Sequence, residues 1–340
     1  MQGKVLWGMG ITFLALMLAG LEGKGSWAQE STLGPFQVSG WMEFYGSLNW
    51  EGKAANALRV FDGPTGFRFN GMELSLEKSP ASWGLRVDLV VGPIGDAVQG
   101  ANNIVQQFYA TLPLRGGWSL DVGKFVTPHG AEVIETKDNW NASRGLLFGF
   151  AIPFYHTGLR MRGRVNETLA LAGFLVNGWD RVDDNNRGKT LGLQSTWSLG
   201  PSLSLTANWM GGPEQPGVES RWRHLVDTLL SYQPSPRLAF LLNADYGTEE
   251  GMGQWSGLAL YGRYGLGEGR SLALRIEGFN DSDGARGLGG HAGEATLTYE
   301  QRLGPEHLLR WEYRHDRGNR PFFNGQRSQN TLSATLVVLF

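Results

Sequence analysis

The 340-residue sequence contains no cysteine, which excludes disulfide bonds and thiolate metal sites. It also has almost no net charge, with 30 basic against 32 acidic residues, so no nucleic acid or other polyanion is indicated as a partner. The six histidines show no paired spacing of the kind that ligates a metal ion. We therefore expect neither a metal site nor another cofactor.

Long hydrophobic runs are absent after the first 28 residues. Before that point the chain has a positive start at Lys4, an apolar run over 5–21, and small residues at Ser26 and Ala28. This pattern predicts a signal peptide at 1–28 and a mature domain at 29–340. A membrane-anchoring helix is the alternative, although the run is short and contains three glycines. Later segments all fall short of the roughly 18–20 apolar residues that a membrane-spanning helix requires.

Glycine and large aromatic residues are abundant, with 50 Gly, 13 Trp and 17 Phe. They fit a protein of many turns with aromatic belts. The clearest alternation covers 36–50, where apolar residues and glycines occupy one face and the other carries Gln37, Ser39, Glu43, Ser47 and Asn49 with Trp41 and Tyr45. Since successive side chains of a strand point to opposite sides, this segment is predicted to be a half-buried strand.

The last ten residues form another alternating segment, whose Phe340 face is wholly apolar. A bare terminal strand is an exposed edge unless it closes a barrel. Similar alternation predicts sixteen strands, with a bulge at Asn70-Gly71 in the second. Their ranges are 36–50, 67–78, 83–91, 105–112, 118–126, 156–164, 168–176, 190–198, 202–210, 223–232, 237–246, 255–264, 270–279, 292–301, 307–316 and 331–340.

The connections between these segments alternate in length. Short turns follow the even-numbered strands and longer polar loops follow the odd-numbered ones, as in outer-membrane barrels. Aromatic residues next to both sets of connections predict two interfacial girdles. The predicted fold is therefore all-β: a transmembrane antiparallel up-and-down barrel of 16 strands, with its apolar phase against outer-membrane lipid. A soluble sandwich or propeller would require about two domains, and no linker divides the chain.

Charged residues on the opposite phase are predicted to face the interior of the barrel. Strand 156–164 carries three of them in a row, Arg160, Arg162 and Arg164. The other predicted lumen-facing charges are Glu43, Glu73, Arg86, Asp88, Asp121, Arg275, Glu277, Arg310 and Glu312. A 16-stranded barrel encloses an aqueous channel, whose selectivity is set by charges at its narrowest point.

Several segments resemble a family of bacterial outer-membrane porins, the OmpL-like, beta-barrel porin type 2 group. They are Gly40-Trp-Met-Glu-Phe-Tyr-Gly46, Gly84-Leu-Arg-Val-Asp88, Leu120-Asp-Val-Gly-Lys-Phe125, the run 145–160 and Gly173-Phe-Leu-Val-Asn-Gly-Trp-Asp180. The resemblance covers nearly all of the mature chain. It implies a water-filled pore in the bacterial outer membrane, reached by export through the periplasm, but it names no solute.

The longest predicted connection, Thr127 to about Tyr155, follows the fifth strand, where porins commonly fold a loop into the pore. The resemblance thus implies an inserted loop. Its acids Glu132, Glu135 and Asp138 are available to face Arg160 and Arg162, and we hypothesise a constriction with a transverse field between them. The alternative is that these arginines are solvated lumen residues near the periplasmic rim, above all Arg164.

The function expected from these features is passive diffusion of small hydrophilic solutes or ions. Two other functions remain open: a structural or adhesive barrel with a plugged lumen, and a barrel lipid hydrolase. The hydrolase is disfavoured because the outward Ser195 has no clear histidine partner. Porin analogy implies a homotrimer, and the C-terminal strand ending in Phe340 implies recognition by the barrel-assembly machinery.

Overall fold

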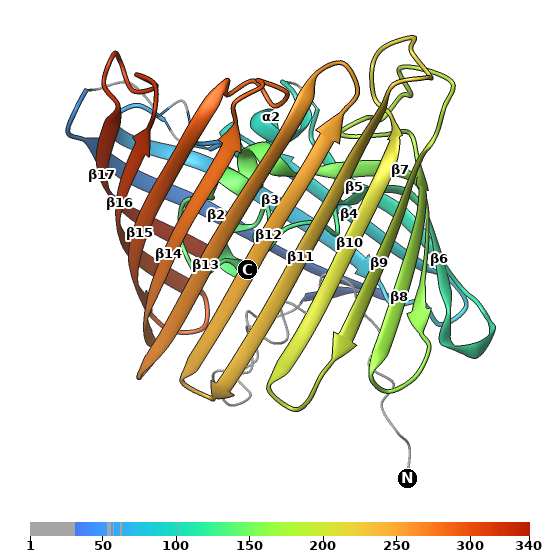
Figure 1. Cartoon of the computed structure of the whole chain (residues 1–340). Coiled ribbons are helices and arrows are strands. Elements are labelled where there is room, and N and C mark those ends of the chain that lie inside the picture. Colours follow the sequence, from blue (N-terminus) through green and yellow to red (C-terminus); the bar gives the residue numbers. More distant parts are fainter. Residues whose placement is uncertain (1–30, 53–55, 57, 62, 102) are drawn as a thin grey trace.

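The computed structural model describes residues 31–52, 56, 58–61, 63–101 and 103–340. The predicted signal peptide lies outside these ranges. The described chain forms one tilted ring of antiparallel strands (Figure 1). Within the described ranges no helix has the length and apolar character that a membrane crossing requires.

Sixteen consecutive strands make up the ring, and each pairs with the next along the chain. They are β2 (Phe36–Asn49), β3 (Gly66–Lys78), β4 (Gly84–Val91), β5 (Val105–Pro113), β6 (Ser119–Val126), β7 (Tyr155–Arg164), β8 (Leu169–Val176), β9 (Thr190–Ser198), β10 (Leu203–Pro213), β11 (Trp222–Ser235), β12 (Leu238–Glu249), β13 (Gly253–Gly267), β14 (Arg270–Asp281), β15 (Gly290–Arg302), β16 (His307–Gly318) and β17 (Ser328–Leu339). A further short strand, β1 (Ser31–Leu33), pairs with the start of β2.

The ring closes where β17 pairs with β2. At the end of this seam the Gly40 N–H donates to the Phe340 carbonyl oxygen at 2.7 Å, and the Phe340 N–H donates back at 3.0 Å. The Phe340 ring lies over Gly40, where a side chain would leave no room for it. Closure leaves the terminal strand without a free edge.

The sequence-based prediction of a 16-stranded antiparallel barrel is confirmed, and each predicted strand has a counterpart. The bulge is confirmed too: Glu43 pairs with Gly71 and Phe44 with Phe69, which leaves Asn70 as the extra residue. Two details were wrong. Strand β1 was not predicted, and the connection between β12 and β13 is only residues 250–252, because both strands extend beyond their predicted ends.

Burial alternates along the strands as a membrane barrel requires. In β14 the outward Leu272, Leu274 and Ile276 are exposed, whereas the inward Arg275 and Glu277 are buried. This inverts the pattern of a soluble protein, since apolar residues face outward toward lipid. Exposed aromatics lie at both ends of the wall, including Trp83, Tyr232, Tyr264 and Phe340 near short turns and Trp50 and Tyr246 near the opposite rim.

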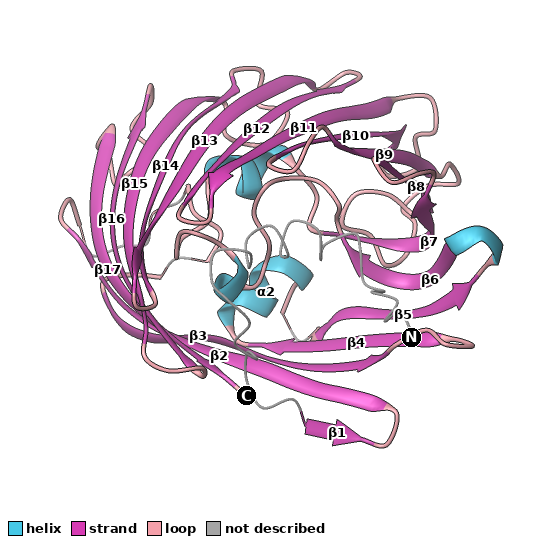
Figure 2. Cartoon of the chain, turned by 90° about the horizontal axis from the view of Figure 1, so that it is seen from below, coloured by secondary structure: helices cyan, strands magenta, loops and turns pink. Residues whose placement is uncertain are grey.

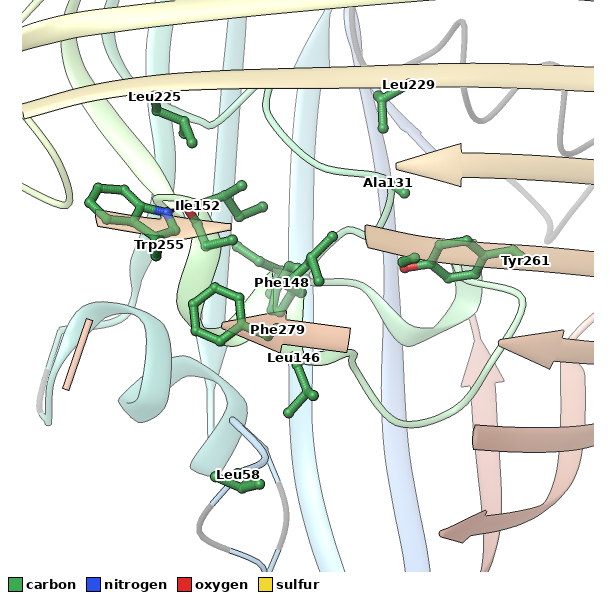
Figure 3. Packing of buried hydrophobic residues seen from close by; sticks show 14 of the residues in the cluster. Leu58, Ala131, Leu146, Phe148, Ile152, Leu225, Leu229, Trp255, Tyr261 and Phe279 are labelled. Atoms are coloured by element: carbon green, nitrogen blue, oxygen red, sulfur yellow. Dashed lines mark hydrogen bonds between the residues drawn. The ribbon is translucent and has the colours of Figure 1, made fainter. Parts of the chain in front are cut away.

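The interior of the ring is occupied by chain segments from one rim. A view along the barrel shows loops and helix α2 (Pro93–Gln99) inside the wall (Figure 2). The 3-10 helices η1 (Arg115–Gly117) and η2 (Thr136–Asp138) and the π-helix η3 (Leu147–Ala151) complete the secondary structure. Residues of η3 pack in an apolar cluster with inward residues of β11–β15, such as Trp255, Tyr261 and Phe279 (Figure 3).

The seam provides a test of the fold. A valine at Gly40 would place its Cβ 2.5 Å from the Glu73 carbonyl oxygen and from the Phe340 ring. We expect Gly40→Val to destabilise the barrel by about 1–3 kcal/mol, the usual cost of overpacking. The measurement is the folded fraction on gels that separate the compact barrel from the heat-unfolded chain.

The matched control is Gly278→Val, on the outer face of β14, where an added Cβ meets nothing within 4 Å. This variant should fold like the wild type. Equal folded fractions for the two variants would contradict the close contact at the seam.

Candidate pore constriction

The connection between β6 and β7, residues 127–154, is bound to the far wall of the barrel by buried arginines. Arg310 on β16 donates to the carbonyl oxygens of Thr136 at 2.6 Å and Asn139 at 2.5 Å. Arg275 on β14 donates to the Ser143 carbonyl oxygen at 2.7 Å and pairs with Glu132 at 2.5 Å. Since these guanidiniums are fully desolvated, their bonds to the loop fix its position.

Acidic side chains of the same wall accept the backbone N–H groups of the loop. Glu312 accepts from Ala142 at 2.7 Å and from Ser143 at 3.0 Å. Glu277 accepts from Leu146 and Leu147. The wall therefore supplies partners that a loop inside a barrel otherwise lacks.

These contacts change the interpretation of four predicted lumen residues. Arg275, Glu277, Arg310 and Glu312 do point inward, but the loop covers them and each is at most 5% exposed. They hold the loop and do not line open water. The sequence predicts lumen-facing charges at these positions, and at this wall the loop takes the place of open water.

The opposite side of the loop leaves an open cavity of about 200 Å³ against the inner faces of β3–β7. Its lining combines wall residues with residues of the loop. The charged members include the arginines Arg86, Arg160 and Arg162 from the wall and the acids Glu132, Glu135 and Asp138 from the loop. The structure thus brings the predicted arginines and acids to one cavity.

Arg160 and Arg162 share one carboxylate. The Nε atoms of both donate to Asp121 Oδ2 at 2.8 Å. The Arg160 guanidinium also lies over the rings of Phe125, at 4.5 Å, and Tyr109, at 5.2 Å. Two cations against one anion leave local positive charge around Asp121, whereas Glu73 and Glu77 supply negative charge elsewhere on this wall. The third arginine of the row, Arg164, is exposed at the end of β7 and does not line the cavity.

Each of the three loop acids has a nearer partner than Arg160 or Arg162. Glu132 pairs with Arg275, Glu135 accepts a bond from Gln106 at 2.6 Å, and Asp138 pairs with Lys137 at 2.5 Å. No direct pair between these acids and Arg160 or Arg162 occurs among the described contacts. The two sets face one cavity without touching, because strand and loop partners lie closer.

The remaining predicted lumen charges are also paired within the wall or with the loop. Glu43 accepts from Asn70 at 2.8 Å and from Thr136 on the loop. Arg86 donates to Asp88 at 2.7 Å and to Glu77 at 2.6 Å. Glu73 accepts from Ser75 at 2.8 Å and from Gln106 at 3.3 Å.

The cavity residues that were not predicted include Lys137, Tyr109 and Gln107. Lys137 adjoins Asp138 in the sequence, and the adjacent acid and base could have indicated a local pair. Tyr109 and Gln107 lie on the inward phase of β5, so the alternation that placed Phe108 outward also implied their direction. Nothing in the sequence indicated that they border a cavity.

Electrostatics in the loop depend on burial. Burial raises the pKa of the Glu135 carboxyl, and the nearby Asp138 carboxylate raises it further. For Lys137, burial disfavours the charged form, but the carboxylates of Asp138 and Glu135 outweigh it and the pKa is raised. Lys137 and Asp138 thus form a neutral pair, whereas Glu135 is a group whose negative charge grows as the pH rises.

A closed 16-stranded barrel with an outward apolar band and a loop bound across its interior defines the class of outer-membrane porins. Residues 35–340 match the model of the family described as "Putative beta-barrel porin-2, OmpL-like". The chain belongs to this family and is an outer-membrane porin, which forms a channel for passive diffusion. Its location is the bacterial outer membrane.

Solved structures share the fold at low sequence identity. OmpT from Vibrio cholerae in its trimer form has 11% identity and a TM-score of 0.61, covering 90% of this chain and 99% of OmpT. An anion-selective porin from Comamonas acidovorans has 13% identity and a TM-score of 0.60, with 92% and 100% covered. The channel DcaP of Acinetobacter baumannii has 12% identity and a TM-score of 0.61, with 92% and 99% covered. A search of curated protein sequences found no match.

The anchoring of the loop predicts a large effect at Arg310. Arg310→Met removes the donors to Thr136 and Asn139 and leaves their buried carbonyl groups unsatisfied. We expect a loss of about 3–5 kcal/mol in the free energy of unfolding, measured by urea titration in detergent. The control is Arg270→Met, whose partner Glu268 is largely exposed and whose pair contributes about 0.5 kcal/mol or less. Similar losses in both variants would show that the loop is not held by Arg310.

Proposed function

We propose that solutes pass along the inner faces of β3–β7, through the cavity between this wall and the loop. The observation that supports the route most directly is that Arg160, Arg162, Glu135 and Asp138 line one cavity. At the opposite wall the charged residues bind the loop instead. In this proposal the constriction lies to one side of the barrel.

Charge is separated across this cavity. On the wall, two guanidiniums share the single carboxylate of Asp121. Glu135 on the loop and Glu73 on β3 both accept bonds from the same Gln106 amide and have no guanidinium partner among the described contacts. The resulting transverse field orients small dipolar solutes. The negative charge on the loop side of the cavity increases as rising pH deprotonates Glu135.

The solutes that fit are small, hydrophilic and either ionic or dipolar. Large apolar solutes would lose hydration at the charged walls without replacing it. The name of the Comamonas acidovorans porin states anion selectivity, and the excess positive charge at Arg160 and Arg162 supports the same preference here. The acids on the loop should moderate that preference.

The double variant Arg160→Gln and Arg162→Gln tests the constriction. A unit charge acts on an ion about 4 Å away with roughly 1 kcal/mol in water, so the anion-to-cation permeability ratio should fall by roughly fivefold or more. The measurement is the reversal potential across a planar bilayer in a KCl gradient. Glu135→Gln should move the ratio the opposite way.

The matched control is Arg164→Gln, on the same strand but outside the cavity. It should leave the reversal potential unchanged. If the double variant folds and keeps the wild-type reversal potential, Arg160 and Arg162 do not form the constriction.

A catalytic role is not favoured. The directly opposed neighbours of Ser195 are Leu171 and Ala207, neither of which is a base. His315 contacts Asn330 through Nδ1 at 2.9 Å. We therefore propose that the barrel is not a lipid hydrolase, and release of fatty acid from phospholipid vesicles by the purified protein would contradict this. The plugged structural barrel predicts no conductance in the same bilayer measurement.

Assembly and export complete the proposal. We propose a homotrimer, which the trimer form of OmpT supports and which native mass measurement in detergent would test. Cleavage after Ala28 is testable by sequencing the mature N-terminus. Recognition of the C-terminal strand by the barrel-assembly machinery fits the half-exposed Phe340, and deleting Phe340 should reduce insertion in cells.

A further inference from the structure

The interior holds a second, smaller cavity on another side of the loop. It has a volume of about 30 Å³ and lies between the loops and the β2–β17 wall, where Tyr45, Ser47 and Thr331 line it. Ser47 and Thr331 lie near the rim that carries the long connections, since Asn49 and Thr331 are paired. The larger cavity instead reaches Lys78 and Pro80, at the short turn between β3 and β4. The small cavity therefore lies toward the rim of the long connections, whereas the larger one reaches from Val126 and Thr127, at the end of β6 on that side, to the opposite rim.

Two aromatic rings stand between these spaces. Phe61, from the connection between β2 and β3, lines the small cavity, and Phe148, in η3, lines the large one. Their centroids are 5.8 Å apart with the rings nearly edge to face. Phe154 continues the row at 5.2 Å from Phe148 and also lines the large cavity. The boundary between the two cavities is thus formed by aromatic rings, with the nearly fully buried Arg144 beside them.

The buried Arg144 contacts both rings and helps to fix their position. Its guanidinium lies 5.1 Å from the Phe61 ring centre and 6.0 Å from that of Phe148. It donates to the carbonyl oxygens of Val133, at 2.8 Å, and Ala142, at 2.7 Å. Because Arg144 is nearly fully buried, it acts on the rings and on the loop backbone and offers little charge to water.

We propose that Phe61 and Phe148 form the permeability barrier of the pore, separate from the charged residues that set its ion preference. An apolar constriction between two wetted spaces expels water and slows ions more than its width alone would. This inference rests on the proposed permeation route and extends it from the larger cavity, past the two rings, to the small cavity at β2 and β17. It assigns conductance and size limit to the two rings, and charge preference to Arg160, Arg162 and the loop acids.

Substitutions of opposite size test the barrier. Phe61→Ala removes one ring from a half-buried position, and we expect the single-channel conductance in KCl to rise by roughly two- to tenfold, the factor that corresponds to one aromatic pair. Phe148→Ala should act in the same direction. Phe61→Trp should lower the conductance, a change that a merely loosened loop would not produce. Swelling of vesicles in uncharged sugars should report a raised size limit for the alanine variants alone.

The control is Phe150→Ala. Phe150 follows Phe148 in η3 and stacks on Phe279 at 5.7 Å, but it lines neither cavity. Its conductance should equal that of the wild type. A rise at Phe150→Ala equal to that at Phe61→Ala would overturn the barrier, because general loosening would then explain both.

The results of these experiments distinguish a failure of the proposed barrier from a failure of the proposed permeation route. If Phe61→Ala and Phe148→Ala conduct as the wild type does while the arginine variants change the reversal potential, the barrier is wrong and the proposed route stands. If the alanine variants conduct more while the arginine variants leave the reversal potential unchanged, the barrier stands and the constriction is misplaced. A lack of conductance in the wild type and in both alanine variants would overturn the barrier as well.

Discussion

The structure depends on one set of bonds, those between the charged inner wall of β14–β16 and the backbone of the loop 127–154. A loop inside a barrel has peptide groups that neither a helix nor a sheet satisfies. Here Arg275 and Arg310 donate to its carbonyl groups, whereas Glu277 and Glu312 accept from its N–H groups. The wall is paired with the loop, and the remaining water-filled space is displaced to the other side.

Apolar packing reinforces this arrangement. The inward positions of β11–β15 include apolar residues such as Leu229, Leu241 and Tyr261, which would be costly in a water-filled lumen. They pack against Leu146, Phe148 and Ile152 of the loop. The barrel consequently has apolar surface on both sides of this wall, toward lipid outside and toward the loop inside. Polar residues also line the inner faces of β3–β7, where they border the cavity.

The sequence was sufficient for the strands but not for the loop. Alternation is a local property with a period of two, so the sixteen strands, the bulge at Asn70 and the outward aromatics followed from neighbouring residues. Leu241 broke the polar inner face of its strand, and its packing against the loop explains why. The pairs between Glu132 and Arg275 or Ala142 and Glu312 join residues more than a hundred positions apart. No periodicity predicts such contacts, so the partners that anchor the loop did not follow from the sequence.

In the proposed pore, different residues anchor the loop, set the ion preference and form the permeability barrier. This division has a physical consequence. Charged groups that are fully paired in a buried network cannot also stabilise a passing ion, because their hydrogen-bonding capacity is used. Arg160 and Arg162 differ because they share one carboxylate and retain part of their capacity toward the cavity. An apolar barrier such as Phe61 and Phe148 carries no charge to pair. Its effect on permeation therefore adds to that of the field instead of competing with it.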